Sequence, residues 1–148
     1  MSKAKGLVWC LTEPALPNWL TPRDCPRVGY RAIDSSSEED IARFFSSTSR
    51  HCVVIERDWL ARMLTTTLFV YEFDSVNFYF DETAGFYVSD QTEVPISVTV
   101  YNDLFGELFR RDVEIRILNN LWELASSIQQ STLKWSLCRM KYAKAKPM

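Results

Sequence analysis

The chain has 148 residues, of which 47% are hydrophobic and 24% charged, with only four glycines. This composition excludes disordered, collagen-like and low-complexity chains, and the length fits one domain with a hydrophobic core. Seventeen Lys and Arg against nineteen Asp and Glu give a formal net charge of −2, which argues against nucleic-acid binding by bulk electrostatics. No run approaches the ~20 apolar residues of a membrane span, and residues 1–11 lack the apolar stretch of a secretory signal. We therefore expect a soluble, cytoplasmic protein without membrane association.

The first half of the chain predicts strands separated by short helices. Residues 7–11 are an apolar run typical of a strand, and a proline-containing segment at 13–17 predicts a turn or short helix. A second strand is expected at 28–33, and Ser35–Ser37 followed by three acids predicts the start of a helix. Another strand at 51–56 precedes a helix around 59–64.

The second half predicts mainly β structure with two further helices. Strands are expected at 66–74, 78–80, 86–89, 96–101, 113–117 and 135–141. A helix is expected at 102–111, and Asn120 with Glu123 resembles a capping box that opens a helix through Gln130. The pattern predicts an α+β fold, with a mixed, mostly antiparallel sheet and several short helices. A single globular domain should span residues 1–148, frayed at 1–6 and 143–148.

The four cysteines are widely spaced, without a C-x-x-C pair, and predict reduced, buried thiols rather than a zinc or redox site. Cys25 stands out because Arg23 and Arg27 flank it, and nearby positive charge lowers a thiol pKa. The five tryptophans occur in apolar periodic segments, which favours packing in the core or at its rim.

Most familiar catalytic chemistry can be excluded. The only histidine, His51, cannot build a multi-His metal site, and the sequence contains no Walker loop, G-x-S-x-G or G-x-G-x-x-G motif. Glu72 and Asp74 share one strand face and could share a proton or bind a cation, although exposed strand ends often carry acids. No cofactor follows from these residues.

The densest polar cluster is Arg23, Asp24, Arg27 and Arg31, with Pro22 and Pro26 framing a rigid loop. Two arginines held in this way could donate bidentate hydrogen bonds to a phosphate or carboxylate. The equally weighted alternative is that Asp24 pairs with one arginine and the loop caps the sheet.

Several motifs resemble an uncharacterised bacterial family whose domain has no known function. Its members share a tryptophan-rich strand, a Pro-Arg-Asp-Cys-Pro-Arg-Val loop and a Tyr-Glu-Phe-Asp strand, in this order. The matching stretches here are residues 8–9, 19–28, 59–63, 71–74, 84–89 and 119–122. Members of this family typically open with an extra Tyr-His-Phe-Ser-like strand, whereas this chain begins at about the Val8-Trp9 strand.

The layout of strands is also similar to the ADP-ribosyltransferase-like fold, in which a histidine and an aromatic residue hold nicotinamide adenine dinucleotide. This resemblance implies that Trp9 takes the place of the aromatic residue and that residues 85–89 form the strand that bears the catalytic acid. No acid occurs at 85–89, with Glu82 just before them, and the histidine is absent. Both departures count against transferase activity.

Three functions follow as alternatives. The favoured one is a binding domain whose pocket, lined by Trp9, Arg23, Arg27 and Tyr71, recognises an anionic small molecule, a nucleotide or a protein partner. The second is an enzyme that acts on a nucleotide or nucleic-acid group, with Glu72 or Glu82 as acid or base. The third is a protein-interaction module, because residues 63–109 contain acids but no Lys or Arg, and residues from 124 onward contain Lys and Arg but no acid.

Overall fold

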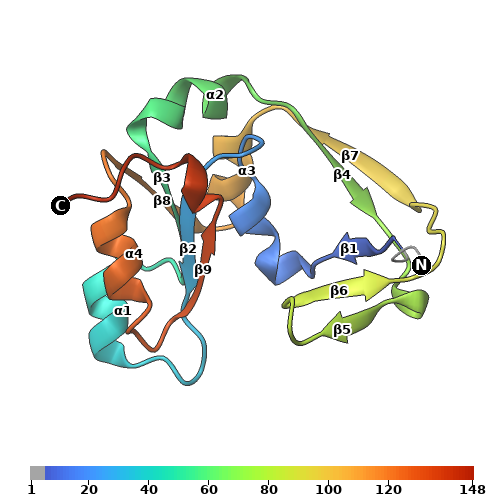
Figure 1. Cartoon of the computed structure of the whole chain (residues 1–148), viewed down its shortest axis with the longest axis horizontal. Helices are drawn as coiled ribbons and strands as arrows, with labels where there is room; N and C mark the ends of the chain where they lie inside the picture. The colour runs from blue at the N-terminus through green and yellow to red at the C-terminus, as the bar shows by residue number, and fades with distance from the viewer. Residues whose placement is uncertain (1–5) are drawn as a thin grey trace.

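A four-stranded sheet is the centre of the fold. The computed structural model describes residues 6–148, and the strand order in this sheet is β8 (Val113–Leu118), β3 (His51–Glu56), β2 (Arg27–Arg31) and β9 (Lys134–Cys138). β3 runs parallel to β8, whereas β2 is antiparallel to both β3 and β9 (Figure 1). The protein is thus α+β, as predicted.

Alternating side chains of the central strands build a hydrophobic core on each face of this sheet. In β3, Cys52 and Val54 join one core, and Val53 and Ile55 join the other. All four side chains are fully buried. A strand that is covered on both faces has an uninterrupted apolar sequence, which explains why residues 52–55 contain no polar side chain apart from the thiol.

The first core lies between the sheet and the helices α1 (Glu38–Phe44) and α4 (Trp122–Ile128). The predicted start of α1 is confirmed, because the Ser37 side chain accepts a hydrogen bond from the Asp40 amide at 3.1 Å. Tyr30 crosses this core, and its hydroxyl donates to the Phe44 carbonyl. The core therefore ties β2 to the end of α1.

The second core lies on the opposite face. It is covered by α2 (Leu60–Thr65), which follows the 3-10 turn η2 (Arg57–Trp59), and by α3 (Leu104–Arg110). The 3-10 helix η1 (Glu13–Trp19) leads to Leu20, which is fully buried in this core. As a result, η1 runs over the same face of the sheet.

The remaining strands extend to one side of this body (Figure 1). One sheet has the order β1 (Val8–Cys10), β6 (Phe86–Ser89), β5 (Tyr79–Asp81), and a two-stranded arm pairs β4 (Leu68–Glu72) with β7 (Ser97–Tyr101). The short 3-10 turn η3 (Ser75–Asn77) connects β4 to β5.

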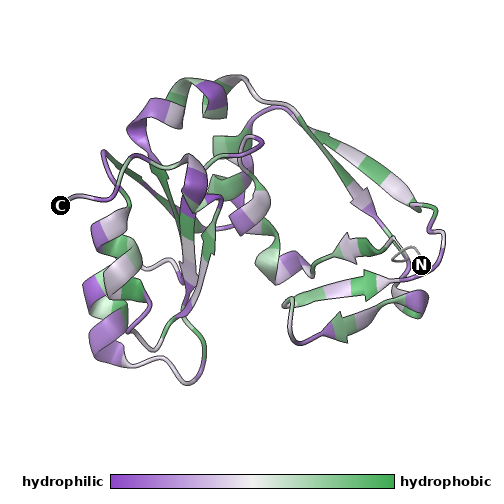
Figure 2. Ribbon diagram, viewed as in Figure 1, coloured by the Kyte–Doolittle hydropathy of each residue, from purple (hydrophilic) through white to green (hydrophobic). Residues whose placement is uncertain are grey.

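One face of the arm is apolar and exposed. Phe69 lies opposite Val100, and Tyr71 lies opposite Val98. Each of these side chains is more than half exposed, and Figure 2 shows hydrophobic residues alternating with others along both strands. The arm is anchored at its base, where Leu68 and Tyr101 pack against the second core.

The sequence predicted the type of most elements and missed some of their ends. The last strand ends at Cys138, and residues 140–142 form the 3-10 turn η4 (Met140–Tyr142), because Arg139 takes a positive φ of 54° that interrupts the strand. The helix expected to open at Asn120 begins at Trp122, whose amide donates to Asn120 Oδ1, and it ends at Ile128 rather than Gln130. The fraying predicted for residues 1–5 falls outside the described residues.

The tryptophans lie at the edge of the cores or outside them. Trp59 and Trp122 are partly buried against the second and first core, respectively, whereas Trp9, Trp19 and Trp135 are exposed. Within residues 6–148, every helix is too short or too polar to cross a membrane.

Candidate functional site

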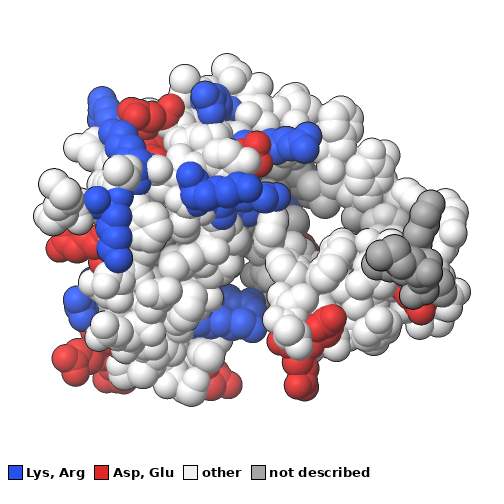
Figure 3. All heavy atoms as spheres, viewed as in Figure 1, with Lys and Arg blue, Asp and Glu red and all other residues white. Residues whose placement is uncertain are grey.

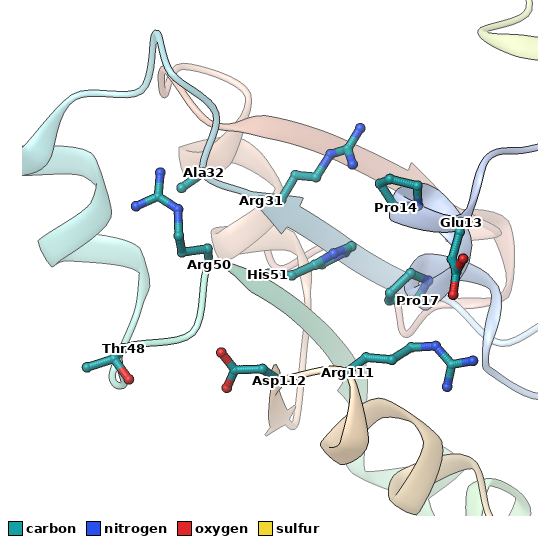
Figure 4. Close-up of a pocket in the computed structure, with 10 residues that line it drawn as sticks. All are labelled: Glu13, Pro14, Pro17, Arg31, Ala32, Thr48, Arg50, His51, Arg111 and Asp112. Carbon is teal, nitrogen blue, oxygen red and sulfur yellow. The ribbon is translucent and has the colours of Figure 1, made fainter.

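A cavity of about 610 Å³ opens where β2 ends and β3 and β8 begin. The register brings its side chains together, because Arg31 at the end of β2 lies opposite His51, and His51 lies opposite Val113 at the start of β8. We call it the arginine cavity (Figure 4). It is lined by Glu13, Pro14, Pro17, Arg31, Ala32, Thr48, Arg50, His51, Arg111 and Asp112.

Two of its three arginines have no polar partner among residues 6–148. Neither Arg31 nor Arg50 donates a side-chain hydrogen bond or forms an ion pair with a residue in the described part of the chain. Arg111 differs, since it donates to Glu107 at 2.8 Å and to the Tyr101 hydroxyl at 3.2 Å. Figure 4 shows Arg31 and Arg111 on opposite sides of His51. The guanidinium groups of Arg31 and Arg50 are therefore available to a ligand.

His51 is neutral at pH 7. Its Nε2 lies 2.8 Å from Asn18 Oδ1, and because a carbonyl oxygen only accepts, Nε2 carries the hydrogen and Nδ1 is an acceptor. Burial, and then the positive charge of Arg31, lower the pKa of His51 to about 4. An anion in the cavity would oppose the charge of Arg31, favour the protonated ring and so raise this pKa.

Asn18 holds η1 over the sheet. Its main-chain carbonyl accepts from Arg27 Nε at 2.6 Å, while its side chain reaches His51. A Cβ atom at Gly29 would lie 2.2 Å from Asn18 Oδ1. Glycine at position 29 therefore leaves the space in which Asn18 orients the histidine.

Two carboxylates also line the arginine cavity. Asp112 Oδ1 accepts from the Ser49 hydroxyl at 3.0 Å, and Glu13 comes from the start of η1. Three arginines against two acids, with a neutral histidine, leave a net charge of +1 on the lining. Figure 3 shows Lys and Arg gathered over the body of the four-stranded sheet on the visible face.

The residues predicted from the sequence to share one pocket lie apart. Arg27 is buried, its Nη1 donates to the Cys25 carbonyl at 3.0 Å, and its guanidinium carbon lies 4.7 Å from the centre of the Trp19 ring. Trp9 lines a second pocket together with Trp19. Arg23 is exposed and Tyr71 lies on the arm, and neither lines either pocket.

The candidate acids belong to the arm and the adjoining sheet. Glu72 accepts from the Ser97 hydroxyl at 3.1 Å, and Asp74 accepts from the Val76 amide and so caps η3. Glu82 is exposed between β5 and β6. None of the three lines either pocket.

Cys25 is not an activated thiol. It is fully buried, and burial raises its pKa to about 12, although the charge of Arg27 acts in the opposite direction. Desolvation thus outweighs the flanking charge that suggested a lowered pKa. All four cysteines are free, and no group of three potential metal ligands occurs among residues 6–148.

Sequence reasoning identified Arg31 as part of a polar cluster but missed the residues that surround it here. Arg50 and His51 are adjacent in the sequence, but Arg111 follows 60 positions later, and no motif connects them with Arg31. The one available signal was strand alternation, which places Arg31 and Gly29 on the same face of β2. Pairing of β2, β3 and β8 then assembles the site.

Comparison with known proteins finds one relationship. A model of a family of unknown function, DUF6886, matches residues 1–143. No curated protein and no solved structure matches the chain. The predicted resemblance to a family without known function is confirmed.

Proposed function

We propose that this chain binds a small anionic molecule in the arginine cavity. The chain belongs to DUF6886, a family of unknown function. The ligand carries a phosphate or carboxylate group, and an anionic nucleotide is one member of this class. The proposal rests on a single observation, which is that Arg31 and Arg50 line one cavity without a polar partner among residues 6–148.

The chemistry of the lining supports this ligand class. A planar guanidinium matches the oxygens of phosphates and carboxylates, and charge-assisted hydrogen bonds are about twice as strong as neutral ones. His51 lies between Arg31 and Arg111, and it can take up a proton when an anion binds. The two acidic residues of the lining favour a ligand that also carries hydrogen-bond donors, such as hydroxyl or amino groups.

Inorganic pyrophosphate is a suitable probe. We expect calorimetry to show binding that Arg31→Ala and Arg50→Ala each weaken by about tenfold or more, since a hydrogen bond to a charged group contributes roughly 1.5–3 kcal/mol. Arg57→Ala is the matched control, because Arg57 is exposed in η2 and does not line the cavity.

The single histidine offers an independent readout. Its ring signals in the proton NMR spectrum belong to His51 alone, and their titration should move to higher pH when pyrophosphate is bound. Unchanged affinity in Arg31→Ala and Arg50→Ala, together with an unshifted His51 titration, would overturn the proposal.

The other functions derived from the sequence stay predictions. For an ADP-ribosyltransferase-like enzyme, Glu72 and Glu82 lie outside both pockets. For a protein-interaction module, the exposed apolar face of the arm is the favourable observation, because contiguous apolar patches often mark interaction sites. Bacterial origin and cytoplasmic location are likewise predictions.

A further inference from the structure

A second, apolar pocket of about 290 Å³ lies where β1, β6 and the end of η1 meet. Trp9, Cys10, Leu11, Trp19 and Phe86 line it, and we call it the tryptophan pocket. Its aromatic rings are set edge to face. The Phe86 ring centre is 6.1 Å from Trp9 and 5.5 Å from Trp19, at interplanar angles of 86° and 68°.

The lining carries no charge. Among residues 6–148, the five that line it include no acidic or basic side chain, and Cys10 is a neutral thiol because burial, and then the charge of Glu93, raise its pKa. An ionic group placed there would lose hydration without gaining a counter-charge from the lining. The pocket therefore favours an uncharged occupant.

A cation is disfavoured for a second reason. The guanidinium of Arg27 already lies over the Trp19 ring, at 4.7 Å from its centre. A cation bound against the same ring would compete for its negative face and be repelled by Arg27. This distinguishes the tryptophan pocket from an aromatic cage that binds a quaternary ammonium group.

The size of the pocket limits the ligand. Apolar cavities of about 150 Å³ in other proteins accommodate benzene, and typical small-molecule pockets span roughly 300–1,000 Å³. A volume of 290 Å³ is therefore suited to one ring system of one or two fused rings.

We propose that the tryptophan pocket binds an uncharged planar aromatic ring, which packs edge to face against Phe86 and contacts Trp9 and Trp19. This site is separate from the arginine cavity. The start of η1, with Glu13 and Pro14, lines the arginine cavity, while its last residue, Trp19, lines the tryptophan pocket.

Three related compounds test the class of ligand. Indole is neutral, tryptamine is a cation and indole-3-acetate is an anion at pH 7, and all three carry the same ring. In 15N-labelled protein, we expect indole to shift the side-chain N–H signals of Trp9 and Trp19 and to leave that of Trp135 unchanged. We expect tryptamine and indole-3-acetate to bind about tenfold more weakly or worse, because the charged group of each loses hydration and none of the described lining residues offers it a counter-charge.

Variants test the location. Trp9→Ala should weaken indole binding by about tenfold, in line with the energy of an aromatic pair plus its buried area. Trp135→Ala is the matched control, since Trp135 is also exposed but lies on β9 of the other sheet. If Trp9→Ala fails to fold, Leu11→Trp provides a second test, because it should fill the pocket and abolish binding.

Three results would overturn the proposal. They are an absence of indole binding up to its solubility limit, equal affinity for the charged analogues, and equal shifts of Trp135 and Trp9. Arg31→Ala should leave indole binding unchanged. The outcome is therefore independent of the pyrophosphate experiment.

Discussion

His51 couples the electrostatics of the arginine cavity to the stability of the fold. Its pKa is about 4 in the folded chain, against an ordinary value of 6.5, because burial and Arg31 disfavour the charged ring. The unfolded chain consequently binds a proton on this group at a higher pH than the folded chain does. Between pH 6.5 and 4 the unfolded state holds more protons, so protonation favours unfolding.

We predict that the free energy of unfolding falls as the pH decreases through this window, by up to roughly 3 kcal/mol from His51 alone. Urea unfolding at pH 7, 5.5 and 4.5 measures the effect. His51→Gln is the control, because glutamine retains a donor for Asn18 and does not titrate. Other groups also titrate below pH 5, so the quantity of interest is the difference between the two proteins. An identical pH dependence in both would contradict the role of His51.

At the scale of elements, the two parts of the β structure differ in how they are supported. β2 and β3 each pair with a strand on both sides, and the side chains of β3 enter both cores while those of β2 enter the first. The arm has only two strands and exposes Phe69 and Tyr71, and an isolated pair of strands is marginally stable by itself. Its stability depends on its base, where Leu68 packs against the second core.

We predict that the backbone amides of β4 and β7 exchange with solvent at least about 100-fold faster than those of β2 and β3, because local opening of the arm breaks few buried contacts. Hydrogen exchange followed by NMR measures both sets at once. Leu68→Ala should accelerate exchange in the arm further, while Phe69→Ala, which removes an exposed side chain of the same arm, should have little effect. Uniform protection across both sheets would show that the arm is held by more than its base.

At the scale of the whole molecule, the four-stranded sheet makes its two cores interdependent. Val54 faces one core and Val53 the other, and the same backbone supports both. Loss of β3 would expose the two cores together, because each core packs against side chains of this strand. This arrangement supports the prediction of a single domain.

We predict that both cores unfold in one transition. Trp59 packs against the second core and Trp122 against the first, so their side-chain N–H signals report on the two cores separately. In a urea titration the two signals should give the same midpoint, as two-state unfolding requires. Trp135, on the edge strand β9, is an internal reference for the sheet itself. Separate midpoints for Trp59 and Trp122 would divide the chain into two folding units.

Local patterns in the sequence were sufficient for the fold class and for most elements. The apolar run at 51–56 and the serine cap before α1 each act over a few residues, and both predictions are confirmed. Element ends were less accurate where one residue decided them. Arg139 ends β9 through a positive φ, which the sequence does not predict because arginine rarely adopts this conformation.

The pairing of strands decided which residues share a site. Arg31, His51 and Arg111 lie up to 80 positions apart in the sequence, and only the order β8-β3-β2 brings them to one end of the sheet. Conversely, Arg23 and Arg27 are close in the sequence but differ in burial, because Arg27 lies on a strand face that η1 covers. Composition and periodicity thus determined that this is an α+β protein without a familiar catalytic motif. Tertiary structure alone decided which arginines line a cavity without a polar partner among residues 6–148, because burial and hydrogen bonding are properties of the packed chain.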